Sequence, residues 1–249
     1  MSYSNLTEFL LSKADIQPAA SILDVGCGTG RELIKMGELA GDKARLVGVD
    51  KAERCIEQAK AAVKKDDRYT FMTADLAQQL PFEDDTFDLV FSKDVLECIV
   101  DKRDFLQEVH RVLKPGGQIV MAHYDFDTQV FDGSNKALVR KMVQAYSDWE
   151  QAWMDDSDGW IGRRLWKYIN STGLFSGSMD SYVLIETTYK PGYFGYNRVQ
   201  DFRDMIEKGF ISEDDYGTFK DDMEDLAGKN QYLYSINSYV YSGTGKSLR

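Results

Sequence analysis

The chain has 249 residues, enough for one or two domains and for a substantial buried core. Hydrophobic residues make up 43% of it and charged residues 29%, a composition that excludes collagen-like, low-complexity and mostly disordered proteins. Its 30 basic and 41 acidic residues give a net charge of −11, which opposes binding to nucleic acid or to an anionic membrane surface, so we expect neither as a partner.

The three cysteines, Cys27, Cys55 and Cys98, are an odd number and lack the C-x-x-C spacing of metal or redox sites. The N-terminus carries no apolar secretory segment, and no apolar run approaches the roughly 20 residues that span a bilayer. We therefore expect a cytoplasmic protein with reduced thiols and no bound metal.

The first half of the chain alternates between short apolar runs and amphipathic segments. Strands are expected over residues 21–25, 45–49, 69–73, 87–91 and 118–122, and helices over 7–14, 31–39 and 53–64. A further helix is broken by the Pro-Gly-Gly turn at 115–117 and has an apolar face made of Phe105, Leu106, Val109, Val112 and Leu113. Five strands separated by helices are typical of a parallel α/β sheet with helices on both faces.

The second half has a different composition. Residues 128–170 are predicted to be helical, contain all four tryptophans and are interrupted by the acidic stretch 155–159. Two more strands are expected at 182–188 and 232–241, with an acidic helical segment between them. Because no repeat or long linker separates the halves, the sequence predicts one α/β domain over residues 1–249. Its doubly wound, seven-stranded, mainly parallel sheet would have a helical insertion, 126–175, after the fifth strand, and residues 176–249 would complete it.

A glycine-rich turn joins the first expected strand to the helix after it, with the sequence Asp-Val-Gly-Cys-Gly-Thr-Gly at 24–30. Glycines permit positive φ angles and a close approach of the backbone to a ligand. The G-x-G-x-G spacing differs from the G-x-G-x-x-G of dinucleotide sites, and no Lys-Ser/Thr pair follows as it does in a P-loop. The turn therefore disfavours a diphosphate ligand.

Acidic residues end the next two expected strands. Asp50 follows the second strand, where a carboxylate is placed to accept both hydroxyl protons of a ribose, and Asp75 follows the third, beside the apolar Leu76. Together with Asp24, these carboxylates favour a nucleoside ligand whose other end is cationic. Asp is also a preferred helix N-cap, which is the alternative interpretation of Asp50 and Asp75.

Four motifs occur in order in this half: ILDVGCGTG followed by Asp50, TADL at 73–76, FDLVFSKDVLE at 87–97 and EVHRVLKPGG at 108–117. They resemble the class I S-adenosylmethionine-dependent methyltransferases, in particular the ubiquinone/menaquinone-biosynthesis-like and natural-product branch. The resemblance implies a Rossmann-like methyltransferase fold, S-adenosylmethionine as cofactor and a small-molecule methyl acceptor.

The resemblance also implies which residues hold the cofactor. The glycine turn would wrap the methionyl and ribose parts, the acid before it would lie near the ammonium group, and the acid ending the second strand would bind the ribose diol. The Asp-Leu pair after the third strand would contact adenine, and the end of the fourth strand would flank the sulfonium. In chain order these residues are Asp24, Gly26, Cys27, Gly28, Gly30, Asp50, Lys51, Asp75, Leu76, Ser92 and Lys93.

His123, Tyr124 and Asp125 follow the fifth strand, at the edge where open α/β sheets bind ligands, and are the candidate catalytic residues. A histidine with an unperturbed pKa of about 6.5 can take a proton at neutral pH, so His123 could act as a general base. The alternative role of His123 is to form hydrogen bonds or to orient a ligand. The tryptophan-rich insertion would cap the crevice. With the acidic surface, it favours a small, aromatic, neutral or cationic acceptor, and it leaves the acceptor atom (N, O or C) open.

Two other classes of function remain open. The chain could bind S-adenosylmethionine as a scaffold or regulatory module without transferring its methyl group, or it could be a nicotinamide oxidoreductase, which the glycine spacing disfavours. His110 is expected to be structural. Asp155, Asp156 and Asp158 lack calcium-loop spacing and are expected to form a solvated turn.

Overall fold

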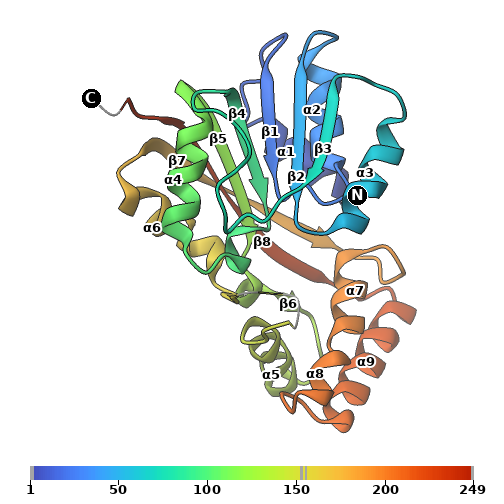
Figure 1. Cartoon of the computed structure of the whole chain (residues 1–249). Coiled ribbons are helices and arrows are strands. Elements are labelled where there is room, and N and C mark those ends of the chain that lie inside the picture. Colours follow the sequence, from blue (N-terminus) through green and yellow to red (C-terminus); the bar gives the residue numbers. More distant parts are fainter. Residues whose placement is uncertain (1–2, 152–153, 155, 248–249) are drawn as a thin grey trace.

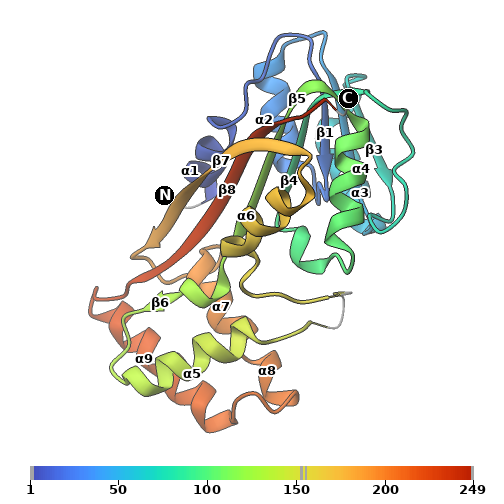
Figure 2. The same ribbon diagram turned by 90° about the vertical axis from the view of Figure 1, so that its left-hand side faces the viewer.

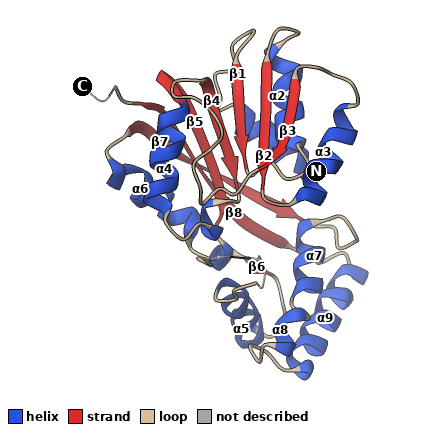
Figure 3. Cartoon of the chain, viewed as in Figure 1, coloured by secondary structure: helices blue, strands red, loops and turns tan. Residues whose placement is uncertain are grey.

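The computed structural model describes residues 3–151, 154 and 156–247. A twisted sheet runs through the upper part of the molecule, with helices on both faces and a helical lobe below it (Figure 1; Figure 3). Five of its strands are parallel and neighbour one another in the order β3 (Tyr69–Thr73), β2 (Arg45–Asp50), β1 (Ser21–Val25), β4 (Phe87–Lys93) and β5 (Leu113–Tyr124). The antiparallel part follows as β8 (Tyr234–Gly245), which pairs with β5, β7 (Phe175–Glu186) and β6 (Val130–Phe131).

The predicted α/β fold with a mainly parallel sheet is confirmed, but two details were wrong. The sheet of the described chain has eight strands rather than seven, because the two residues of β6 pair with β8 directly after a short 3₁₀ turn, Phe126–Thr128. The Pro-Gly-Gly segment at 115–117, predicted as a turn between the helix and the fifth strand, is not a turn outside the sheet. It lies within β5, where a register shift against β4 between Phe87 and Leu89 absorbs the extra residues.

The helices divide between the two faces of the sheet. On one face lie α1 (Tyr3–Leu11), α2 (Arg31–Ala40) and α3 (Glu53–Val63), and on the other α4 (Lys102–Val112) and α6 (Ile161–Thr172). Successive side chains of a strand point to opposite faces, and β1 follows this rule: Ile22 packs in the first cluster and Leu23 in the second. The buried, apolar run of β1 is the result.

The helical lobe is built from two distant parts of the chain. It contains α5 (Lys136–Ser147), α7 (Phe194–Asp201), α8 (Asp204–Glu207) and α9 (Glu213–Gly228), and Figure 2 shows it at the end of the sheet where the parallel strands finish. Residues 126–175, predicted as a helical insertion, contribute α5 to this lobe. The apolar face of α6 (Ile161, Leu165 and Ile169) is buried against the sheet, and α7–α9 supply the rest of the lobe.

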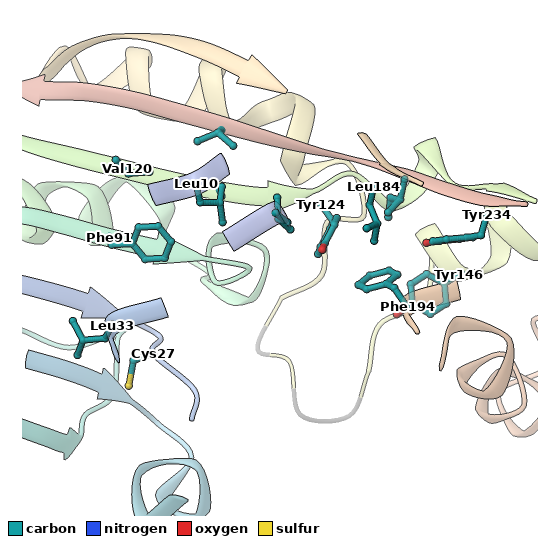
Figure 4. Close-up of a cluster of buried hydrophobic side chains, with 14 of the residues drawn as sticks. Leu10, Cys27, Leu33, Phe91, Val120, Tyr124, Tyr146, Leu184, Phe194 and Tyr234 are labelled. Carbon is teal, nitrogen blue, oxygen red and sulfur yellow. The ribbon is translucent and has the colours of Figure 1, made fainter. Parts of the chain in front are cut away.

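The lobe and the sheet share one hydrophobic cluster, which runs from Leu10 and Phe91 to the rings of Tyr124, Phe194 and Tyr146 (Figure 4). The ring centroids of Tyr124, at the end of β5, and Phe194, on α7, are 4.7 Å apart. Because this cluster is continuous, we propose that the whole chain folds as one domain. Among the described helices, none combines the length and the apolar character needed to cross a membrane.

Candidate functional site

Two cavities open at the edge of the sheet where the parallel strands end, and both are lined by Asp94. The first, here called the sheet pocket, has a volume of about 360 Å³ and lies among the loops that follow β1, β2, β3 and β4. The second, the cap pocket, has a volume of about 410 Å³ and lies between the end of β5 and the helical lobe. A ligand in one cavity is therefore adjacent to a ligand in the other.

The glycine turn forms one wall of the sheet pocket. Gly26 has φ of 76°, and a Cβ atom there would lie 2.1 Å from Cγ2 of Val95, so no other residue fits without moving that side chain. Gly30 has φ of 78°, and its Cβ would lie 2.8 Å from the ring of Phe71. Both positions therefore require glycine, one against the pocket and one against the core.

Asp50 and Asp75 both line the sheet pocket and stabilise the loops that carry them. Asp50 accepts hydrogen bonds from the backbone N–H of Gly28 and of Ala52, each at 2.8 Å, and Asp75 accepts one from Ala77 at 3.0 Å. The alternative interpretation as helix N-caps was wrong, because Ala52 is the N-cap residue of α3 and the described chain has no helix between β3 and β4. Each carboxylate oxygen has a second lone pair, so the same groups can also accept from ligand hydroxyls.

Asp24 lies behind the glycine turn and is 1% exposed. Its Oδ1 atom has no hydrogen-bond partner among the described residues. Burial, assisted by the negative charges of Glu32 and Asp50, raises the pKa of Asp24 well above its usual range, while Lys93 acts in the opposite direction. A buried carboxyl group without a partner suits a ligand that brings a positive charge or a hydrogen-bond donor.

Several other residues that the sequence predicted to bind the cofactor do not line the sheet pocket. Cys27 is buried in the core, where burial raises the pKa of its thiol, and Ser92 is buried and donates a hydrogen bond to the carbonyl of Val25 at 3.0 Å. Lys93 faces the cap pocket and forms an ion pair with Asp94. Of the eleven predicted residues, those that line the sheet pocket are Gly26, Asp50, Lys51, Asp75 and Leu76.

Aromatic rings and charged groups line the cap pocket. The rings come from three parts of the chain and belong to Tyr124, Phe126, Tyr146, Trp149 and Phe194. Among them the guanidinium of Arg198 lies 4.8 Å from the ring centroid of Tyr146 and 4.9 Å from that of Phe194. The carboxylates of Asp94, Glu97, Asp201 and Asp204 outnumber the cations of Lys93 and Arg198, so the pocket favours a cationic or neutral ligand.

The three candidate catalytic residues separate in the structure. Tyr124 lines the cap pocket, whereas His123 and Asp125 are fully buried and line neither cavity. The carboxylate of Asp125 accepts hydrogen bonds from Nε and Nη2 of Arg163, both at 2.6 Å, and one from the backbone N–H of Arg163 at 3.1 Å. Asp125 therefore ties the end of β5 to α6.

Sequence reasoning did not identify several residues that line these pockets. Asp94, Val95 and Cys98 follow β4 within the FSKDVLE motif and its continuation, and a polar residue directly after a buried strand was the available signal. Phe194 and Arg198 lie on α7, in a segment without any local motif. These two residues line the pocket because α7 packs against the end of β5, and the spacing of apolar residues in the sequence does not predict that contact.

The residues of the acidic stretch are used in ion pairs. Asp156 binds Nζ of Lys102 at 2.7 Å, and Asp158 binds Nη1 of Arg164 at 2.8 Å, while Asp155 lies outside the described residues. Within the part of the chain that the structure describes, no three His, Cys, Asp or Glu side chains gather as a metal site would require.

Comparison with known proteins places this architecture in a family. Residues 16–173 match the family described as Methyltransferase domain. The chain is 35% identical over 111 residues to a demethylmenaquinone methyltransferase of Staphylococcus epidermidis, a match that covers 45% of this chain and 46% of that protein. The chain spans about half the length of the curated relatives it matches.

Solved structures share the fold at low sequence identity. Phosphoethanolamine N-methyltransferase 2 of Haemonchus contortus, in complex with S-adenosyl-L-methionine, is 20% identical with a TM-score of 0.57, and the match covers 98% of this chain and 53% of that one. The cyclase SpnF is 16% identical with a TM-score of 0.59, covering 97% of this chain and 80% of that one. The same architecture therefore occurs in proteins named for different reactions.

Proposed function

The chain belongs to the methyltransferase domain family, whose cofactor is S-adenosylmethionine, and from this premise we propose that it methylates a small acceptor held in the cap pocket. The acceptor is aromatic and neutral or cationic. The observation that carries the proposal is the pair of adjoining cavities that share Asp94. The sheet pocket has the glycine turn and two aspartates, Asp50 and Asp75, suited to bind ribose and adenine, and the cap pocket has aromatic rings and an excess of carboxylates.

The residues of the sheet pocket fit this cofactor. Asp50 lines the pocket and suits the ribose hydroxyls. Asp24 lies behind the glycine turn, and its buried Oδ1, which has no hydrogen-bond partner among the described residues, suits the ammonium group through that turn. Asp75 offers a hydrogen-bond acceptor to adenine, and Leu76 offers an apolar wall. When bound, the cofactor supplies a methyl group attached to a positively charged sulfur, and the carbon of this methyl group is the electrophile of the reaction.

The work of the chain's own residues is then mainly binding and orientation. Rings on β5, α5 and α7 hold the acceptor and exclude water, and the loop after β4 sets the distance between the two pockets. Such positioning supplies roughly 7 to 11 kcal/mol of barrier reduction in favourable systems. From composition we also propose that the protein works in the cytoplasm and binds no nucleic acid.

The test is a screen of small phenols, amines and quinols with the radiolabelled cofactor and the purified protein. We expect label in one acceptor class and a loss of transfer when a cap-pocket ring is removed, as in Phe194→Ala, compared with Phe210→Ala, an exposed ring that does not line the pocket. Cofactor binding by calorimetry without transfer to any acceptor would favour the scaffold alternative. No binding at all would overturn both.

A further inference from the structure

Behind the cap pocket lies a buried carboxyl and imidazole pair that the proposed function has not used. Glu97, in the 3₁₀ turn Leu96–Cys98 after β4, lines the cap pocket and is only 5% exposed. His123, at the end of β5, is fully buried, and its Nε2 lies 3.6 Å from Oε1 of Glu97. The carboxyl group therefore stands between the pocket and the imidazole.

The backbone determines which nitrogen of His123 carries a proton. Nδ1 lies 2.7 Å from the carbonyl oxygen of Tyr124, and a carbonyl only accepts hydrogen bonds, so Nδ1 is the donor. In the neutral ring Nε2 then holds a lone pair, and it has no hydrogen-bond partner among the described residues. A buried acceptor without a donor is costly, and the O–H of a protonated Glu97 is the nearby group that can satisfy it.

The charges around Glu97 place its proton exchange near neutral pH. Burial raises the pKa of Glu97 to about 7. Asp94 and Asp158 act in the same direction, while Arg198, and His123 in the charged form of its ring, act in the opposite direction. Burial also pushes the pKa of Asp94 upward, but Lys93, His123 and the hydrogen bond from the Tyr124 N–H, at 3.2 Å, bring it below its usual value. Asp94 therefore stays ionised while Glu97 exchanges its proton.

We propose that Glu97 is the base that removes the acceptor's proton and that His123 is a positioning residue that holds this proton on the Glu97 carboxyl. The inference rests on the proposed methyl transfer, and it specifies the acceptor as an X–H group that must lose a proton, such as an amine, a phenol or a thiol. The lone pair of X forms the bond to the methyl carbon, and the carbon–sulfur bond breaks with its electrons left on sulfur. The proton of X passes to a carboxylate oxygen of Glu97.

The first experiment uses the free protein. The chain has two histidines, so ¹⁵N-histidine labelling in a His110→Gln background leaves His123 as the source of imidazole signals. We expect a ring protonated on Nδ1, with an Nε2 signal that moves in one step as the pH rises through about 7, because the hydrogen bond from Glu97 is then lost. The step should be absent in Glu97→Gln. A ring protonated on Nε2, or a step unchanged in Glu97→Gln, overturns the proposal.

The second experiment uses the acceptor found in the labelled-cofactor screen. We expect kcat/KM to rise with pH to a plateau, with a midpoint near 7, because the base form of Glu97 is populated above its pKa. Glu97→Gln should lower kcat by about 100-fold to 10,000-fold and remove the midpoint, and Glu97→Asp should recover part of the rate. His123→Gln should shift the midpoint, and the exposed control Glu57→Gln should change neither quantity.

Label transfer by the wild-type protein separates failure of the proposed methyl transfer from failure of the proposed role of Glu97. Wild-type protein that transfers no label defeats the proposed function, and the imidazole titration still decides whether the pair shares a proton. Wild-type protein that transfers label with a pH profile unchanged by Glu97→Gln defeats the inference alone.

Discussion

The sheet pocket and the cap pocket share Asp94 but are assembled in different ways. Each side of the sheet pocket is a loop that directly follows a parallel strand, so its residues lie close to recognisable motifs. The cap pocket collects side chains from β4, β5, α5 and α7, which are separated by up to about half of the chain. The sheet pocket is therefore a consequence of strand order, whereas the cap pocket is a consequence of how the lobe packs.

The two pockets also differ in their supports. The sheet pocket is held by the backbone of a buried sheet and by hydrogen bonds within its own loops, such as those of Asp50. The cap pocket depends on contacts between elements, including the rings of Tyr124 and Phe194 and the Asp125–Arg163 pair that anchors the end of β5. Changes to one support should therefore leave the other pocket intact.

The largest effect is expected from Asp125→Ala, which removes the partner of Arg163 behind the cap pocket. Asp125 is buried, but Arg163 is 35% exposed and keeps its contact with Asp127, so loss of these charge-assisted hydrogen bonds should lower the free energy of unfolding in denaturant titrations by about 2–3 kcal/mol while cofactor affinity is retained. Asp127→Ala, at a longer and partly exposed contact of 3.2 Å, is the matched control and should cost less than about 1 kcal/mol. A normal stability with lost turnover would instead give Asp125 a chemical role.

The next largest effect is expected in the wall of the sheet pocket. Gly26→Ala combines the strain of a positive φ, about 1–2 kcal/mol, with displacement of Val95 into the cavity, so both stability and cofactor affinity should fall. Gly28→Ala shares the positive φ, at 51°, but has open space around its Cβ, so it should show the strain alone. Equal losses of cofactor affinity in the two variants, measured by calorimetry, would contradict this account of the turn.

Asp50→Ala removes a carboxylate that lines the sheet pocket and also accepts hydrogen bonds from the backbone of its loops. Loss of charge-assisted hydrogen bonds to the ribose should weaken cofactor affinity by about 1–3 kcal/mol in calorimetry. The exposed Asp42→Ala serves as the control for the change in net charge. An unchanged affinity would refute the ribose assignment and leave Asp50 with its loop-stabilising role.

The smallest effect concerns the charge of the cap pocket. Asp204 lines this pocket from α8 and is exposed, so Asp204→Asn should raise the KM of a cationic acceptor only by about threefold at low salt, through lost Coulomb attraction. A neutral acceptor of the same shape should be unaffected, and high salt should remove the difference. A larger change with the neutral acceptor would show that Asp204 acts through structure rather than through charge.

Much of the sheet and part of the site could be predicted from the sequence. β1 and β3 have the predicted bounds, because short apolar runs that end at glycine or aspartate have few other ways to bury themselves. Gly26, Asp50 and Asp75 were found because their motifs follow such strands. Glu97 was quoted within a motif but not chosen, since nothing local marks a glutamate as buried beside a histidine 26 residues later.

What the sequence alone determined is the alternation of strands and helices, the family and the position of the glycine turn, since each depends on neighbours within a few residues. Only the tertiary structure decided that α6 joins the sheet while α7–α9 join the lobe, and that His123 turns inward to meet Glu97. The physical reason is that the burial of a side chain and its contacts with other side chains arise from packing between segments that are distant in the sequence. Local periodicity says which face of an element is apolar, but not which element will cover it.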